Sequence, residues 1–510
     1  MNFYSEANNC FNINVNYTIP EIYLTTAILI LLVYGVVNQK ILITDKHYQY
    51  PILTTSVNWL SIYVLVITLI LNGNNHQYGV SFNNMLHTND FISFFKMLLI
   101  IATIATLLIS LDYLKRNKTY IYEYGVLILL SVLSMLLLLS SFDFISMYLA
   151  VEFQSLCFYI LATSKRTSKM STEAGLKYFI LGAFSSCILL FGISLIYGFS
   201  GTTSFSDLYL LFNGAFAVDF LQNYAANPLF IGLMFIIVGL LFKLTAVPFH
   251  MWAPDVYEGS PTNVTAFFLI VPKIAVFGFF IELFFSVFHD LVEWWQPIMI
   301  FSSLASMMLA SFAALYQKKI KRLLAYSAIG HVGYLLIALA NFTQFSLESF
   351  VIYIVIYVAM SVGFFGSILA LQNKHTSSSN KYLVSLKGLS KQNPLLAASM
   401  AIILFSFAGI PPLAGFWSKM MLLFGLTSNY MYFPALVAVL ASSIGAFYYL
   451  RVIKIMYFES PQRWPSYYQI GKPASIVIAL SVLFILFFFM YPDFLFFLAH
   501  KKVSSILLSY

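Results

Sequence analysis

The sequence predicts an all-α polytopic membrane protein with about 14 transmembrane helices. Of its 510 residues, 60% are hydrophobic and 9% are charged, whereas soluble domains are about 25% charged. Apolar runs long enough to cross a bilayer as a helix recur from end to end. The polar stretches between these runs are too short for a large soluble domain. We therefore expect almost the whole chain to lie in or against a membrane.

Fourteen runs reach the length of a membrane span. In chain order they cover residues 20–37, 51–71, 91–112, 121–140, 143–163, 173–198, 228–252, 262–287, 294–316, 320–340, 347–371, 395–427, 431–458 and 473–498.

The basic residues alternate with this span order. Connections after odd-numbered spans and their flanks contain 20 of the 27 lysines and arginines, and connections after even-numbered spans contain none. By the positive-inside rule, the odd-numbered connections face the cytoplasm or the mitochondrial matrix, and both termini face the opposite side. Two features depart from this rule: an acidic connection after span seven, and Lys501 and Lys502 on the outer side. The 20 residues are Lys40, Lys46, Lys115, Arg116, Lys118, Lys165, Arg166, Lys169, Lys318, Lys319, Lys321, Arg322, Lys374, Lys381, Lys387, Lys391, Arg451, Lys454, Arg463 and Lys472.

Two of the apolar segments are too long for one span and contain proline partway. Residues 228–259 are interrupted at Pro248, and residues 395–427 at Pro411 and Pro412. Proline removes a backbone donor, and in lipid the freed carbonyl needs a partner in protein or water. We therefore expect two broken helices in the interior. They are the seventh and twelfth spans, and their separation by five predicts two inverted five-helix repeats, as in transporters.

This repeat predicts four segments along the chain: residues 1–120 with the first three helices, 121–290 with the first repeat, 291–460 with the second, and 461–510 with the C-terminal helix. The N-terminal stretch has no basic region, so we expect neither a secretory signal nor a transit peptide. Cys10, Cys157 and Cys187 lack the spacing of a metal site or a disulfide.

A few ionisable residues lie deep inside predicted spans. Lys243, Lys273 and Lys419 are lysines of this kind, and Glu152 is nine residues from either end of its helix. A lysine at mid-bilayer costs about 2.5–3.5 kcal/mol on insertion scales, so a functional role is the favoured interpretation for all four. His331 could be a satisfied core histidine, but its ring can both donate and accept a proton, which suits a relay.

Other charged residues have simpler explanations. Lys96 is near the start of its span, so we expect it to snorkel to the surface. Lys177 follows Glu173 by four residues, the spacing of a helical ion pair, and both a structural and a functional role stay open. His250, just past Pro248, is expected near the surface with no favoured role. Glu282 is interpreted as structural, pairing a lysine or reaching water.

A buried lysine beside a mobile carboxylate can act as a proton switch. Burial favours the neutral amine, while a nearby carboxylate favours the charged form. Bringing a lysine from 10.4 to about 7 takes roughly 4 kcal/mol, similar to moving one charge against about 150–200 mV. We therefore expect Lys243 to hold its proton when Glu152 is near and to pass it on when Glu152 turns away. The helix break would hydrate and loosen the lysine's surroundings.

Six stretches together resemble the antiporter-like membrane subunits of respiratory complex I, NADH:ubiquinone oxidoreductase. The resemblance covers about residues 125–455, and the first two stretches are most like the subunit 2 branch of this family, called N in bacteria. A lysine at the second break favours subunit 2 or 5 over 4, and no long lateral C-terminal helix follows, which argues against subunit 5. The stretches are VEFQSLCFYIL, GLKYFILGAFSS, LLFKLTAVPFHMWAPDVYEGSPT, VPKIAVF, LLAYSAIGHVGYLL and FSFAGIPPLAGFWSKMMLL.

The resemblance implies proton translocation driven by quinone reduction elsewhere in a complex. It implies that Glu152 and Lys243 form a modulating pair, that Lys273 and His331 connect the two halves, and that Lys419 carries the proton toward the exit. With Lys177, the implied relay residues are Glu152, Lys177, Lys243, Lys273, His331 and Lys419.

The resemblance also implies the setting. This chain would bind no cofactor or metal, and NADH, FMN, iron–sulfur clusters and ubiquinone would belong to other subunits. Its partners would be antiporter-like subunit 4, small subunits of the 4L/K type, the lateral helix of subunit 5 and lipids, with no nucleic acid. We expect the mitochondrial inner membrane, with both termini in the intermembrane space, or else a bacterial plasma membrane.

Two alternatives stay open. A subunit of a multi-subunit cation/proton antiporter would share the fold and the charges, and would depend on sodium rather than on NADH and quinone turnover. A structural membrane scaffold that pumps nothing would hold its buried charges in fixed pairs.

Overall fold

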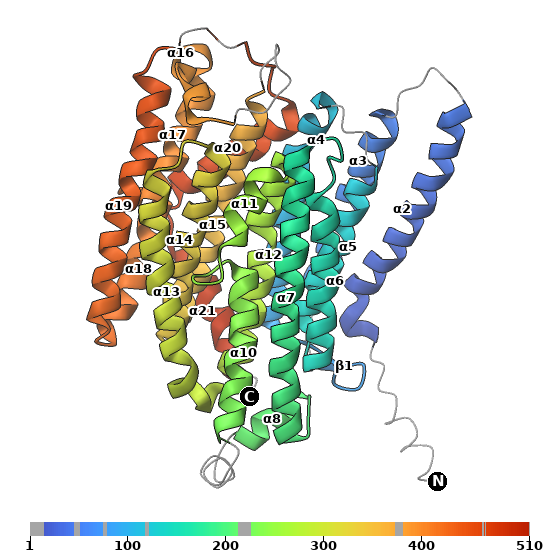
Figure 1. Cartoon of the computed structure of the whole chain (residues 1–510), viewed down its shortest axis with the longest axis vertical. Coiled ribbons are helices and arrows are strands. Elements are labelled where there is room, and N and C mark those ends of the chain that lie inside the picture. Colours follow the sequence, from blue (N-terminus) through green and yellow to red (C-terminus); the bar gives the residue numbers. More distant parts are fainter. Residues whose placement is uncertain are drawn as a thin grey trace.

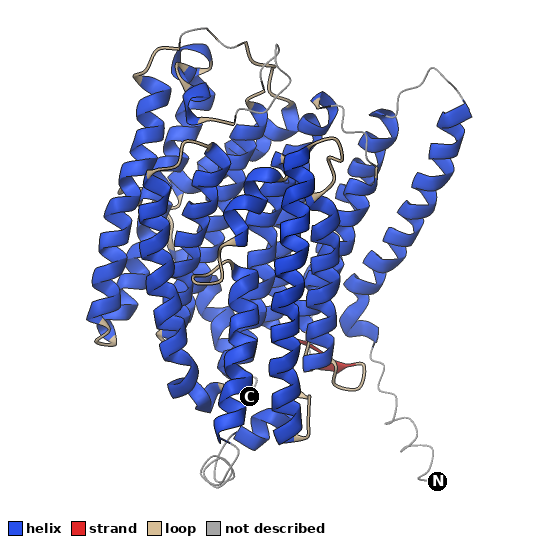
Figure 2. Ribbon diagram, in the orientation of Figure 1, coloured by secondary structure: helices blue, strands red, loops and turns tan. Residues whose placement is uncertain are grey.

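The computed structural model describes residues 15–44, 51–74, 79–117, 122–212, 226–372, 381–461, 464 and 466–508. This part of the chain is a bundle of long helices packed side by side (Figure 1), with a single small hairpin of strands among the described residues (Figure 2). The predicted all-α polytopic class is confirmed. Cys10 and the basic residues Lys46, Lys118, Lys374 and Arg463 lie outside the described residues.

Each predicted span contains a helix. Among the described residues, 11 helices are long and apolar enough to cross a bilayer, and three shorter apolar helices lie at the remaining predicted spans. The unbroken helices are α2 (Ile19–Thr44), α3 (Pro51–Asn74), α4 (Asp90–Arg116), α5 (Glu123–Ser140), α6 (Phe144–Ala162), α7 (Lys169–Ser200), α12 (Thr262–Glu282), α13 (Val292–Leu315), α14 (Ile320–Ala340), α15 (Gln344–Ala370), α19 (Tyr432–Tyr457) and α20 (Lys472–Phe487).

Short elements join these helices. The π-helix η2 continues α12 by five residues, and β1 pairs antiparallel with β2 between α3 and α4. The hairpin was not predicted. The short elements are η1 (Val15–Thr18), β1 (Gly79–Ser81), β2 (Leu86–Thr88), α8 (Phe205–Phe212), η2 (Leu283–Val287), η3 (His289–Leu291), η4 (Leu383–Leu386) and α16 (Leu389–Gln392). The last described helix is α21 (Asp493–Leu508), which has 16 residues.

The two predicted helix breaks are confirmed. The first separates α10 (Ala226–Leu244) from α11 (Trp252–Gly259), and the second separates α17 (Pro394–Ala408) from α18 (Ala414–Ser428). Gly409 ends α17 in the left-handed conformation, at φ +85°, which glycine adopts without strain. The breaks coincide with Pro248 and with the prolines 411–412.

The two broken helices run in opposite directions. Glu258 of α11 forms an ion pair with Lys319, just before α14 begins. By contrast, the Asn341 side chain, just after α14 ends, donates to the Gly425 carbonyl of α18 at 2.7 Å. The two broken helices thus finish at opposite ends of α14, as an inverted repeat requires. The boundaries of the repeats, at residues 121–290 and 291–460, stay a prediction.

Three helices form the interior of the bundle. In α12 every residue is buried, and 89% of the most apolar window of α14 and of α15 is buried as well. The outer helices expose apolar side chains, as membrane-facing helices do. Lys273 on α12 and His331 on α14 are therefore shielded from lipid by the surrounding protein.

Lys96 does not snorkel to the surface, which corrects the prediction. Its side chain is buried, and its Nζ lies 2.5 Å from Oε1 of Glu21 on α2. The buried carboxylate provides the partner that makes burial of the ammonium tolerable.

One further expectation near a helix end is wrong. His250 is buried rather than near the surface, and its Nδ1 has no hydrogen-bond partner among the described residues. Glu282 is also buried, and its Oε1 accepts from Asn89 at 3.1 Å and lies 3.7 Å from Nδ1 of His87; its structural role stays a prediction.

The predicted last span, residues 473–498, is two helices instead of one. The helix α20 ends at Phe487, and α21 begins at Asp493 and packs against α15 and α4. Lys502 of α21 lies 2.8 Å from Asp90 at the start of α4, on the side of the even-numbered connections. We call this side the outer end of the bundle, and the opposite side, with the connections at residues 163–168 and 316–319, the inner end (upper in Figure 1).

Candidate functional site

Lys243 lies in the last turn of α10, directly before the first break. Its Nζ atom is buried and has no hydrogen-bond partner among the described residues. The Oε1 atom of Glu152 on α6 is also buried without a partner, and Oε2 accepts from Ser155 at 3.4 Å. The two predicted partners are therefore held apart in this structure, without a direct ion pair.

A small cavity joins Lys243 to Lys273. Its volume is about 20 Å³, and one water molecule needs roughly 10–15 Å³ on this measure. Polar groups of Gln154, Ser155 and Tyr178 share its lining with aromatic rings. The cavity beside the two lysines is thus large enough and polar enough to hold a water molecule.

Lys273 occupies the centre of α12, in the middle of the bundle. Its Nζ donates to the carbonyl of Ala328 on α14 and to the hydroxyl of Tyr357 on α15, both at 3.2 Å. The Tyr357 hydroxyl in turn donates to the Leu269 carbonyl at 3.2 Å. All acceptors around this lysine are neutral, so the amine is hydrogen-bonded but not balanced by an acid.

His331 lies one turn after Ala328 on α14 and continues the line of polar groups. Its Nδ1 is 2.7 Å from the hydroxyl of Tyr353 on α15, and its Nε2 is 3.4 Å from the hydroxyl of Tyr449 on α19. Both ring nitrogens therefore have a hydroxyl partner that can donate or accept. This geometry allows a proton to enter at one nitrogen and leave at the other.

A second cavity, also about 20 Å³, joins His331 to Lys419. At its far side, the Nζ of Lys419 donates to the carbonyls of Phe407 at 2.9 Å and Ala408 at 3.1 Å. Those carbonyls lose their intrahelical partners because α17 ends there. Lys419, five residues into α18, thus caps the helix on the other side of the break.

Lys177 lies apart from this line. Its Nζ is 2.8 Å from Glu173, as the spacing predicted, and 3.2 Å from Asp255 of α11. Asp255 also pairs with Arg322 at 3.3 Å. The partners of Lys177 are therefore exposed acids at the inner end of the bundle, and its part in the relay stays a prediction.

The sequence analysis did not identify the tyrosines of the site. Tyr353 and Tyr357 are buried in the middle of α15. The signal was available, because two tyrosines four residues apart in VIYIVIYVAM share one helix face inside an apolar run. Tyr449 carried no such spacing and depended on the packing of α19.

The arrangement is suited to moving protons. Among the described residues, no three histidine, cysteine, aspartate or glutamate side chains converge on a possible metal position. Instead, basic groups from α10, α12, α14 and α18 follow one another, separated by tyrosine hydroxyls and two water-sized gaps. Opposed broken helices with buried ionisable groups between them define a class of protein, the ion-translocating membrane proteins built on inverted repeats.

Comparison with known proteins specifies the family. Residues 141–445 match the transmembrane family described as NADH:quinone oxidoreductase/Mrp antiporter, and the chain belongs to this family. The chain is 48% identical over 492 residues to NADH-ubiquinone oxidoreductase chain 2 of Marchantia polymorpha. The aligned region covers 96% of this chain and 98% of that relative.

Two solved structures share the fold. A chain of respiratory complex I from Thermus thermophilus with bound aureothin superposes with a TM-score of 0.74 at 24% identity, covering 94% of this chain and 98% of that one. A chain of the Mrp complex from Dietzia sp. DQ12-45-1b superposes with a TM-score of 0.79 at 19% identity, covering 97% and 98%. The fold is therefore common to both branches of the family.

Proposed function

We propose that this chain is the proton-translocating membrane subunit 2 of an NADH:ubiquinone oxidoreductase, in which electron transfer elsewhere drives protons through this bundle. The observation that carries the proposal is the row of buried basic groups Lys243, Lys273, His331 and Lys419. A water-sized cavity lies between the first two and another between the last two, and Lys273 and His331 each bond a different tyrosine of α15. The sequence identity to a plant chain of that name supports the assignment to this complex.

The geometry supports a division of labour along the line. Lys243 has no hydrogen-bond partner in the part of the chain that the structure describes, so the approach or withdrawal of Glu152 would govern its charge. Lys273 and His331 would connect the two halves, because each contacts a tyrosine of α15. Lys419 would carry the proton toward the exit at the second break.

Glu152 is positioned for a neighbouring subunit to act on it. Four large apolar side chains, Ile145, Leu149, Leu156 and Ile160, are each more than half exposed and form a stripe with Glu152 along α6. A carboxylate in a lipid-facing stripe would be costly. This pattern supports the covering of α6 by another subunit of the membrane arm. The candidates are the small 4L/K-type subunits, subunit 4 and the lateral helix of subunit 5, and lipids would cover the remaining exposed apolar surface.

The proposed complex supplies the redox chemistry. NADH, FMN, iron–sulfur clusters and ubiquinone would bind to other subunits, and this chain would contribute only proton movement. The proposed location is the mitochondrial inner membrane, with both termini on the intermembrane-space side, and a bacterial plasma membrane is the alternative. The basic residues at the inner end of the bundle support this orientation.

The test uses two single variants of the assembled complex, Lys243→Ala and Glu152→Ala. In proteoliposomes fed NADH and quinone, both variants should lower the initial rate of proton uptake at least several-fold, with the complex still assembled on a native gel. Lys318→Ala, an exposed lysine at the inner end, is the matched control and should pump normally. Unchanged pumping or loss of assembly in the test variants would contradict the proposed roles.

A cation/proton antiporter is the second candidate, supported by the TM-score of 0.79 to the Mrp chain. It predicts that proton movement follows a sodium gradient and ignores NADH. A purified native assembly that contains flavin and iron–sulfur subunits and oxidises NADH would exclude it.

A further inference from the structure

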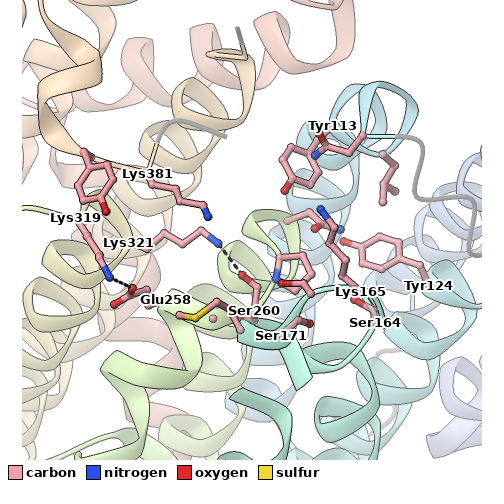
Figure 3. Close-up of a pocket in the computed structure, with 18 residues that line it drawn as sticks. Tyr113, Tyr124, Ser164, Lys165, Ser171, Glu258, Ser260, Lys319, Lys321 and Lys381 are labelled. Carbon is pink, nitrogen blue, oxygen red and sulfur yellow. Dashed lines mark hydrogen bonds and ion pairs between the residues drawn. The ribbon is translucent and has the colours of Figure 1, made fainter. Parts of the chain in front are cut away.

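A further cavity lies at the inner end of the bundle and is not lined by Lys243, Lys273, His331 or Lys419. It has a volume of about 300 Å³ and opens at the end of α4, the starts of α5 and α7, the α11–α12 junction and the start of α14 (Figure 3). Its distinguishing feature is charge. Four lysines, Lys165, Lys319, Lys321 and Lys381, line it together with one carboxylate, Glu258.

The carboxylate is already engaged. Glu258 forms an ion pair with Lys319 and lies 3.5 Å from Arg322. Lys321 donates to the Ser260 carbonyl at 2.6 Å, a neutral acceptor, and Figure 3 shows its amine directed toward that oxygen. Within the described residues, neither Lys165 nor Lys381 has an acidic partner, so none of the amines of Lys165, Lys321 and Lys381 forms an ion pair at the cavity.

Backbone groups add to this positive field. The helices α7 and α12 both begin at the cavity, which Ser168 and Pro261 line, and neither N-terminus has a side-chain cap. These helices have 32 and 21 residues, and their free N–H groups and dipoles favour an anion. Like charges collected without an acid repel one another, and a bound anion would remove that cost.

The surroundings indicate a lipid as the source of the anion. Met170 lines the cavity and is 48% exposed, and Phe184, about four turns further along the same face of α7 and beyond the Glu173–Lys177 ion pair, is an exposed apolar side chain as well. Acyl chains could lie along this face while the headgroup enters the cavity. Basic pockets between transmembrane helices on the cytoplasmic or matrix side are suited to anionic lipid headgroups.

We propose that this cavity is a phosphate-binding site for the headgroup of an anionic phospholipid, held by Lys165, Lys321 and Lys381. The buried Oδ1 of Asn263, which lines the cavity and has no hydrogen-bond partner among the described residues, can accept from a headgroup hydroxyl. Neutral phospholipids, whose headgroups carry their own cation, would gain much less from this site.

The test measures binding of a fluorescent short-chain phosphatidylglycerol to the delipidated, assembled complex. The variant Lys165→Gln/Lys381→Gln leaves the bonds of Lys319 and Lys321 intact. Each surface lysine contributes about 1 kcal/mol to anionic lipid binding, so the double variant should bind about 25-fold more weakly. Arg166→Gln/Lys318→Gln is the matched control, because it removes two charges from the same two regions outside the cavity.

Three outcomes decide the proposal. Weakening in the cavity variant alone, with millimolar inorganic phosphate and phosphatidylcholine competing poorly, supports a lipid headgroup site. Equal weakening in both variants shows a diffuse surface charge effect and overturns it. Binding of inorganic phosphate that displaces the lipid probe at micromolar concentration identifies a soluble anion as the ligand and overturns the lipid assignment.

Discussion

Lys419 has two separable roles, and two substitutions distinguish them. Its ammonium donates to the carbonyls of Phe407 and Ala408, which α17 leaves unpaired at its end. Lys419→Met removes both bonds without adding volume. Bonds from a charged donor contribute about 1.5–3 kcal/mol each, so the loss should be about 3–6 kcal/mol. Lys419→Arg keeps a donor for these carbonyls but cannot release a proton at any physiological pH.

The assay combines thermal unfolding of the purified complex with proton uptake in proteoliposomes supplied with NADH and quinone. The methionine variant should melt earlier and pump poorly. The arginine variant should melt close to the native protein and lose pumping at least tenfold. Lys454→Met, an exposed position on α19, controls for removal of a charge and should change neither property. Native pumping by the arginine variant would refute proton release by Lys419, and native melting of the methionine variant would refute the capping.

The remaining predictions concern packing and the connecting relay. Lys96→Met strands the buried carboxylate of Glu21 and should destabilise the complex by about 3–5 kcal/mol, while adding Glu21→Gln should restore most of the melting temperature. Gly192→Val should prevent assembly, because an added Cβ would lie 2.7 Å from a backbone oxygen of α10, whereas Gly198→Val meets nothing within 4 Å and should assemble on a native gel. Tyr357→Phe removes a hydrogen bond to the buried α12 lysine and should slow NADH-driven proton uptake several-fold, with a stability loss of only about 1 kcal/mol by thermal unfolding.

Local features of the sequence were sufficient to predict most of the fold. Apolar runs identify spans because the bilayer fixes their length, and proline inside a long run identifies a break because it removes a backbone donor. For the same reason, Lys243 and Lys419 could be selected as functional candidates: their depth in an apolar run is visible in the sequence. These inferences need no knowledge of which helices touch.

Contacts between distant segments could not be predicted in the same way. The prediction that Lys96 snorkels to the surface was wrong because its partner, Glu21, is 75 residues earlier in the sequence and lies on a different helix. The tyrosines around His331 come from α15 and α19, and only packing brings them to one ring. The lysines that line the basic cavity likewise come from three separate connections. The positive-inside rule predicts that these connections lie on one side of the membrane, but it does not predict that their lysines line the same cavity.

The lysines at the two helix breaks differ in their hydrogen-bond partners, and this difference affects how each break can move. Lys243 has no hydrogen-bond partner among the described residues, so a change in its charge disturbs no backbone bond. Lys419 holds two carbonyls at the end of α17, and a neutral amine would hold them more weakly than an ammonium. Release of a proton from Lys419 must therefore loosen the contact between α17 and α18, and its return must tighten it. A proton arriving along the line from His331 would then be coupled to movement at the second break, whereas the first break can stay rigid while Lys243 changes charge.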